Sequence, residues 1–65
     1  MPLVITVEGM TCGHCEQTVA EALRDVSGVT DVTVDREEER ATVDGDADAT
    51  ILVEAVEEAG YTAHA

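Results

Sequence analysis

The stretch that decides the fold is residues 19–26, which read VAEALRDV. Its apolar residues lie at i, i+3, i+4 and i+7, and they are Val19, Ala22, Leu23 and Val26. This spacing places them on one face of an amphipathic helix. The same spacing returns 33 residues later in LVEAVEEA, residues 52–59. We call each of these apolar helix faces a stripe. Because the stripe is repeated, we expect the chain also to repeat the strands that flank the helix.

The two stripes predict two helices with recognisable ends. We expect the first helix over residues 13–27, with Gly28 ending it in a left-handed conformation. For the second helix, Asp48 is the candidate N-cap and Gly60 lies just past the end. The apolar face of this second helix consists of Leu52, Ala55, Val56 and Ala59.

Strands are expected before, between and after the helices. Apolar and polar residues alternate over 3–8, 31–35 and 41–44, which is the two-residue period of a strand with one buried face. The charged residues 36–39 read as a hairpin connection, and residues 61–65 allow one short last strand. The chain therefore contains a strand–helix–strand unit twice. This predicts an α+β, ferredoxin-like βαββαβ sandwich, with a four-stranded antiparallel sheet and both helices on one face. We expect residues 1–65 to form a single domain.

The composition restricts the classes of partner. The chain has 15 Asp and Glu against 3 Arg and no Lys, which gives a formal net charge of -12. Nucleic acid and anionic membranes are negatively charged and bind through Lys and Arg side chains, so neither is an expected partner. The apolar runs are too short for a membrane span, and the start does not resemble a signal peptide, so we expect a cytoplasmic protein. A halophilic cytosol, where salt screens self-repulsion, would explain so acidic a surface.

Both cysteines lie in GMTCGHC, residues 9–15, between the first predicted strand and the first predicted helix. In a reducing compartment such a pair indicates a metal or redox site more than a structural disulfide. A helix N-terminus favours thiolate over thiol. Cys15 continues the core-facing stripe and is expected to be sheltered, whereas Cys12 is expected to lie outward on the loop.

Two thiolates favour a soft ion of low coordination number. They do not complete a tetrahedral shell, so two-coordinate Cu(I), one ion per monomer, is the expected occupant of Cys12 and Cys15. Ag(I), Zn(II) and Hg(II) are further ions that the pair would accept. An under-coordinated ion on a loop can take a third thiolate from another protein before it leaves. Tight binding and transfer are thereby compatible.

The sequence resembles the heavy-metal-associated domains of copper chaperones and of copper-exporting P-type ATPases. The resemblance rests on Gly-Met-Thr-Cys-x-x-Cys at 9–15, Gly28-Val29, and Glu58-Ala59-Gly60-Tyr61, and it extends over essentially the whole chain. It implies Cu(I) bound by Cys12 and Cys15 and passed to a partner with a similar pair, such as a copper-transporting P-type ATPase. As a single domain, the chain looks more like the chaperone than an ATPase fragment. We expect a copper-homeostasis protein that is not an enzyme and is monomeric, with a metal-bridged dimer as the alternative.

Neighbouring residues have a structural and a functional interpretation. We interpret Met10 as a core side chain beneath the loop rather than a thioether ligand, because Met fills irregular gaps well. His14 is expected to point to solvent, with ligation to the metal as the alternative. In bacterial members of the family the position of Tyr61 lies near the metal loop, and a half-buried aromatic closing the helix is also expected there. His64 is expected on the surface.

Three other functions use the same CxxC pair. A thiol–disulfide oxidoreductase also places CxxC at a helix N-terminus, but thioredoxin-like folds are longer and need a cis-proline, and the one proline here is Pro2. A structural zinc module needs four ligands, which a dimer of two pairs would supply. A mercury-binding module uses nearly the same residues, and the spacing does not exclude it.

Overall fold

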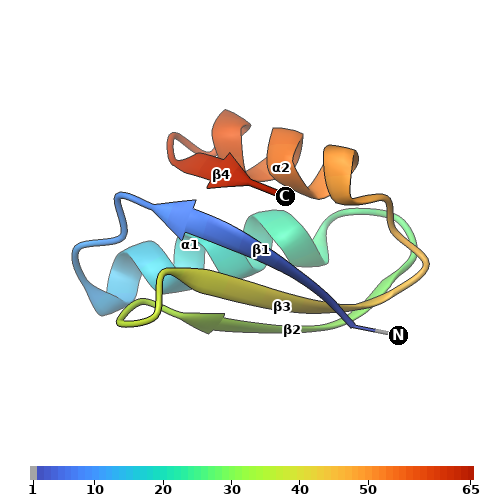
Figure 1. Ribbon diagram of the computed structural model, residues 1–65, viewed down its shortest axis with the longest axis horizontal. Helices are drawn as coiled ribbons and strands as arrows, with labels where there is room; N and C mark the ends of the chain where they lie inside the picture. The colour runs from blue at the N-terminus through green and yellow to red at the C-terminus, as the bar shows by residue number, and fades with distance from the viewer. Residues whose placement is uncertain (1) are drawn as a thin grey trace.

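The computed structural model describes residues 2–65 and contains the predicted elements in the expected order (Figure 1). The bounds of the strands and helices are β1 Leu3–Glu8, α1 Gly13–Arg24, β2 Val29–Asp35, β3 Arg40–Gly45, α2 Ala49–Glu58 and β4 Thr62–His64. Within this part of the chain, neither helix is long and apolar enough to cross a bilayer.

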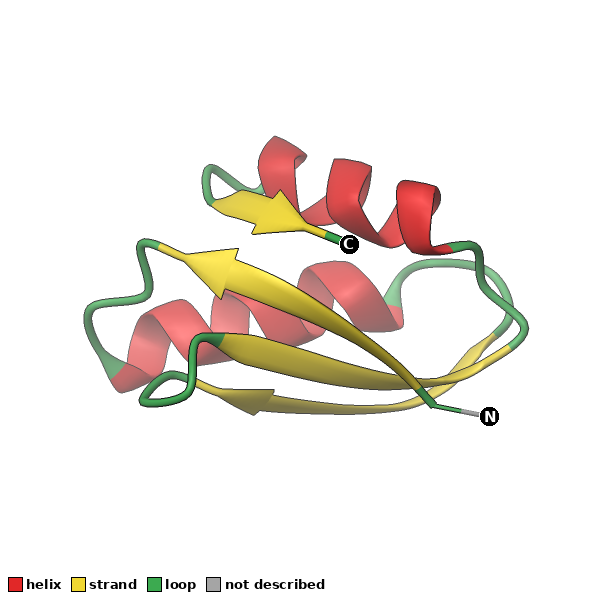
Figure 2. Cartoon of the chain, in the orientation of Figure 1, coloured by secondary structure: helices red, strands yellow, loops and turns green. Residues whose placement is uncertain are grey.

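The strands form one antiparallel sheet in the order β2-β3-β1-β4. β1 lies inside the sheet, where Ile5 is opposite Ala41 of β3 and Val7 is opposite Ala63 of β4. Both helices cover the same face of this sheet (Figure 2). The predicted α+β, ferredoxin-like βαββαβ fold is therefore confirmed.

The core lies between the sheet and the helices and is entirely apolar among the described residues. Its buried members are Ile5, Val7, Met10, Val19, Leu23, Val32, Ala41, Val43, Leu52, Val56 and Ala63. The fully buried members of the two helix stripes are Val19, Leu23, Leu52 and Val56, and the half-buried members are Ala22, Val26, Ala55 and Ala59. Burying a Val or Leu contributes about 1.5–3 kcal/mol, so these side chains hold both helices to the sheet.

Two element boundaries differ from the prediction by two residues or more. α1 ends at Arg24 rather than at residue 27, because the N–H of Val26 donates to the carbonyl of Leu23 at 3.1 Å in a tighter i→i+3 turn. Gly28 has the expected positive φ of 93°, but it turns the chain into β2 instead of ending the helix. β2 also begins earlier than predicted, at Val29, with a register irregularity between Val29 and Asp31 that hides the alternation.

Candidate metal centre

The conformation of the loop between β1 and α1 is fixed by Gly9 and Met10. Gly9 leaves the strand with φ of 94°, a conformation that favours glycine, and lets the chain turn over the end of the sheet. Met10 then inserts its side chain into the core and is 8% exposed. Met10 is thus a core side chain, as predicted. This anchor fixes the backbone on which the two cysteines lie.

The two thiols converge at the start of α1. Cys12 is the N-cap residue of the helix, and the Sγ atoms of Cys12 and Cys15 are 3.4 Å apart. Both cysteines are free. With metal–sulfur bonds of about 2.3 Å, one ion spans two sulfurs up to about 4.6 Å apart. The pair therefore lies within the reach of a single ion.

The two thiols differ in exposure. Cys12 is exposed, whereas Cys15 is half-buried and packs against the core. This is the difference that the sequence predicts from the helix stripe. One sulfur is accessible to an incoming molecule, and the other is held by the fold.

The thiol of Cys15 is acidified by its neighbours. A hydrogen bond from the Tyr61 side chain is the largest cause, followed by hydrogen bonds with the Thr11 backbone and the Cys12 side chain, and together they lower the pKa of Cys15 from 9.0 to about 6. The same contact raises the pKa of Tyr61. Near neutral pH, Cys15 is therefore mostly a thiolate, the form that binds metal.

Among the described residues, no His, Asp, Glu or further Cys side chain joins the pair as a third ligand. In the part of the chain that the structure describes, no three His, Cys, Asp or Glu side chains are grouped so that they could hold one metal ion. His14 is exposed, as predicted, and its carbonyl accepts a hydrogen bond from the Thr18 hydroxyl at 3.0 Å. The site offers two sulfurs and an open side.

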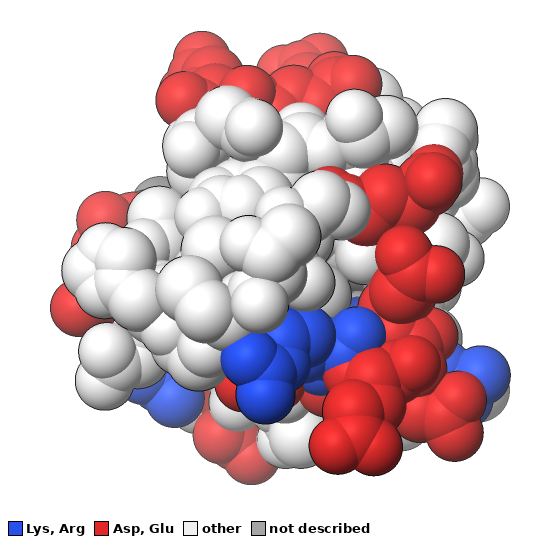
Figure 3. Space-filling view, turned by 90° about the vertical axis from the view of Figure 1, so that its left-hand side faces the viewer, with Lys and Arg blue, Asp and Glu red and all other residues white. Residues whose placement is uncertain are grey.

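The loop lies in an uncharged area at one end of the molecule. Figure 3 looks onto this end and shows a continuous white area, bordered by acidic side chains above, at the left and at the right, and by basic and acidic side chains below. The β2–β3 hairpin reaches the same end, because Glu16 Oε2 accepts the N–H of Arg36 at 2.7 Å and the Glu39 carbonyl accepts the N–H of Val7 at 2.8 Å. An approaching partner thus meets the exposed sulfur on a neutral surface beside an acidic hairpin.

Three contacts were missed by the sequence analysis. The hydrogen bond from the Thr11 backbone to Cys15 depends on loop geometry, which no residue pattern specifies. The bond between Glu16 and Arg36 joins groups 20 residues apart, and its only sequence signal is an acidic residue in the first helical turn. His64 is on the surface, as predicted, but its side-chain hydrogen bond with Glu8 at 2.9 Å was not foreseen.

Comparison with known proteins finds similar sequences and structures. A family model described as heavy-metal-associated domain matches residues 4–62. The chain is 40% identical over 63 residues to a mercuric reductase of Shewanella putrefaciens, which covers 94% of this chain and 11% of the reductase. It is 39% identical over 62 residues to copper chaperone CopZ of Staphylococcus aureus, which covers 89% of this chain and 90% of the chaperone.

A solved structure shows the same architecture. The crystal structure of a copper binding domain from HMA7, a P-type ATPase, has a TM-score of 0.93 to this chain and is 33% identical, over 97% of this chain and 89% of that chain. The similarity thus extends to proteins of three kinds, and the chain spans only a small part of the reductase.

Proposed function

The chain belongs to the heavy-metal-associated domain family, and from this premise we propose that it is a cytoplasmic Cu(I) metallochaperone. Residues 1–65 act as a single domain that binds one Cu(I) through Cys12 and Cys15 and passes it to another protein. Copper is the cargo, and the chain itself catalyses no covalent reaction. The observation that carries the proposal is the pair of free thiols 3.4 Å apart, one exposed and one half-buried.

The donor set favours Cu(I) over harder ions. Thiolates are soft ligands and select Cu(I), whereas Zn(II) in a closed site requires four ligands. Two sulfurs, with no third His, Cys, Asp or Glu ligand beside them among residues 2–65, suit an ion of low coordination number. The lowered pKa of Cys15 supports this function. A larger fraction of this thiol is already deprotonated before the metal binds, so metal binding has to release fewer protons.

Transfer follows from the difference between the two sulfurs. A thiolate of the partner approaches on the exposed side and binds the copper as a third ligand, after which the bond to Cys12 breaks. A second partner thiolate then replaces Cys15, which the core holds until last. Each step exchanges one Cu–S bond for another, and copper remains Cu(I) throughout. The acceptor is a copper-transporting P-type ATPase or another protein with a CxxC pair.

An anaerobic Cu(I) titration against a competing chelator tests this function. We expect one Cu(I) per monomer for the wild type and loss of most of the affinity in the Cys12→Ser, Cys15→Ser double variant. The variant His14→Ala changes an exposed neighbour of the pair and should bind like the wild type. Undiminished binding by the double variant would end the proposal.

A mercury-binding module is the second candidate, and the similarity to a mercuric reductase favours it. The same two sulfurs would hold Hg(II), another soft ion. Transfer separates the two candidates: a copper chaperone delivers Cu(I) to an acceptor with a CxxC pair, whereas a mercury module delivers Hg(II) to a reductase.

Turnover in an insulin-reduction assay would instead support a thiol–disulfide oxidoreductase, and metal-dependent dimers with Zn(II) would support a zinc module.

A further inference from the structure

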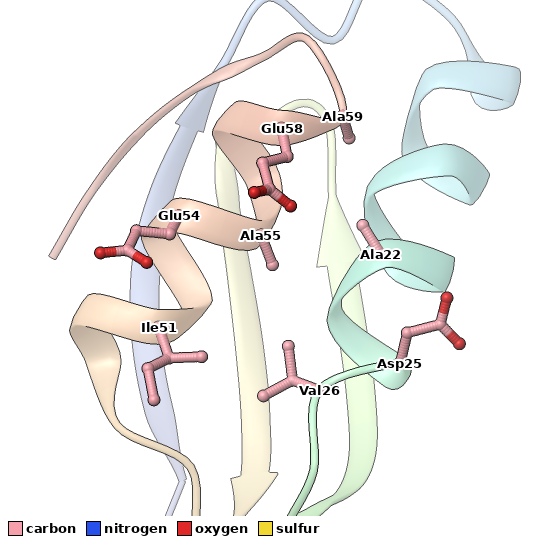
Figure 4. A pocket seen from close by; sticks show the side chains of 8 residues that line it. All are labelled: Ala22, Asp25, Val26, Ile51, Glu54, Ala55, Glu58 and Ala59. Carbon is pink, nitrogen blue, oxygen red and sulfur yellow. The ribbon is translucent and has the colours of Figure 1, made fainter.

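A second surface feature lies between the two helices, away from the thiols. An open groove of about 440 Å³ separates the C-terminal half of α1 from α2. Figure 4 shows the side chains of Ala22, Val26 and Ala55 pointing into the space between the helices. Ile51 lines one end and is 50% exposed, a high value for so large an apolar side chain. The floor of the groove is therefore apolar.

The groove exists because the repeated helix stripe is only partly covered. The stripe members Leu23 and Leu52 are fully buried against the sheet. Ala22 and its counterpart Ala55, 33 residues later, face the other helix and are half-buried, since alanine is too small to fill the gap. Apolar surface that the sequence pattern assigns to the core thus remains accessible between the helices.

The walls of the groove are acidic. Asp25 of the α1 C-cap and Glu54 of α2 project outward on opposite sides, and Glu58 lies over the upper part (Figure 4). In the described part of the chain, no Lys or Arg lines the groove. Among residues 2–65, none of these three carboxylates pairs with a basic side chain. The groove therefore presents unneutralised negative charge on both flanks of an apolar strip.

The position of acidic residues at the end of α2 also favours a cationic ligand. Glu57 and Glu58 occupy the last turn of the helix, where the macrodipole is negative and basic residues are favoured. α2 has no basic residue in that turn. Acidic residues at this end oppose the helix dipole, and a bound cation would relieve that opposition. Local conflicts of this kind are expected at functional surfaces.

We propose that this groove binds an amphipathic helix of a partner protein, with an apolar stripe flanked by Lys or Arg. The apolar stripe of the partner packs on Ala22, Val26 and Ala55, and its basic side chains pair with Asp25 on one flank and Glu54 on the other. An apolar strip that accepts a helix is a common mode of peptide recognition. Charge complementarity selects a basic helix over a neutral or acidic one.

The groove leaves the thiols free while holding a partner near them. Ala22 lies seven residues after Cys15, which is about 10 Å along the helix axis. The end of the groove opposite Ile51 reaches Ala59. Ala59 lies two residues before Tyr61, the hydrogen-bond partner of Cys15. A helix bound here would tether the partner without covering the exposed sulfur of Cys12. This docking goes beyond metal binding and does not require metal.

The test uses the metal-free chain of 65 residues and a synthetic peptide. The peptide is about 18 residues long, sufficient to form a helix, with Leu on one stripe and Lys flanking it. In 15N-resolved NMR titrations we expect saturable shift changes concentrated at Ala22, Val26, Ile51 and Ala55. A scrambled peptide of the same composition, which lacks the stripe, should bind at least about tenfold more weakly. No saturable binding of the designed peptide would overturn the proposal.

Two charge variants with equal net charge locate the binding. Glu54→Gln with Glu58→Gln removes two wall carboxylates, and Glu37→Gln with Glu38→Gln removes two carboxylates from the hairpin tip. All four side chains are exposed, so both variants should fold. We expect the groove variant to weaken peptide binding at least about tenfold and the hairpin variant less than about twofold. Equal losses, or shifts centred on the metal loop, would contradict the proposal. Because peptide binding is measured on the metal-free protein, its failure would not affect the Cu(I) titration, which tests metal binding separately.

Discussion

The two strand–helix junctions of the chain have the same architecture and different chemistry. By the spacing of the helix stripes, the positions of Cys12 and Cys15 correspond to Gly45 and Asp48, 33 residues later. α1 nevertheless begins at Gly13 and α2 at Ala49, so the first helix starts three residues earlier relative to its stripe. This additional turn carries Cys15 and makes Cys12 the N-cap.

The N-cap side chains of the two helices also differ in whether they form a capping hydrogen bond. In the second junction the Asp48 carboxylate accepts the N–H of Thr50 at 2.8 Å and caps α2. In the first junction Cys12 forms no capping hydrogen bond with its side chain. The second junction thus uses its helix end for stability, whereas the first leaves it beside two thiols. One half of the repeat supplies packing, and the other half supplies the chemistry as well.

The largest expected effect concerns position 45, which has no room for a side chain. Gly45 has φ of 130°, and a Cβ there would overlap the carbonyl oxygen of Gly28. We expect Gly45→Ala to reduce the free energy of unfolding by at least about 3 kcal/mol, measured by urea unfolding. This close approach explains why the second junction cannot repeat the cysteine of the first.

Gly13→Ala is the matched control for this substitution. Gly13 lies in the first turn of α1, and a Cβ there would meet no atom within 4 Å. Replacing it should leave stability unchanged or raise it by about 0.5–1 kcal/mol. If Gly45→Ala were as well tolerated as Gly13→Ala, the steric difference between the junctions would be refuted.

A smaller effect is expected from the caps. Asp48→Ala removes a capping hydrogen bond and should destabilise the protein by about 1 kcal/mol. Cys12→Ala in the metal-free protein removes no such bond and should change stability by less than about 0.5 kcal/mol. Thermal unfolding of both variants measures the difference. Equal losses would mean that the first helix depends on its N-cap side chain as much as the second.

The smallest change is the removal of one hydroxyl group. Tyr61→Phe keeps the ring but removes the main hydrogen bond to Cys15, so the pKa of Cys15 should rise from about 6 toward 9.0. The ultraviolet absorbance of the thiolate, followed against pH in the metal-free protein, measures this shift. An unchanged pKa would assign the acidity to the hydrogen bonds with Thr11 and Cys12 instead.

The lowered pKa also predicts how stability depends on pH. Between pH 6 and pH 9 the unfolded chain holds a proton on Cys15 that the folded chain has largely lost. Stability should therefore rise with pH across this window in the wild type, and the rise should be smaller in Tyr61→Phe. Urea unfolding at several pH values measures the slope, and an equal slope in both proteins would contradict the assignment.

The sequence predicted the features that depend on local periodicity and missed those that depend on tertiary geometry. Stripe spacing was sufficient to predict that Cys15 is sheltered and Cys12 exposed, and the structure confirms both. The end of α1 at Arg24 depends on a local hydrogen bond that no residue pattern announces. The groove between the helices was not foreseen, because Ala22 and Ala55 match a core stripe whether or not a neighbour covers them.

The central claim is that two sulfurs of the first junction hold a single soft ion. X-ray absorption spectroscopy at the copper edge of the Cu(I)-loaded protein tests it most directly. We predict a first shell of two sulfur atoms and no nitrogen or oxygen. A first shell made of nitrogen and oxygen alone would contradict the assignment of Cys12 and Cys15 as the ligands.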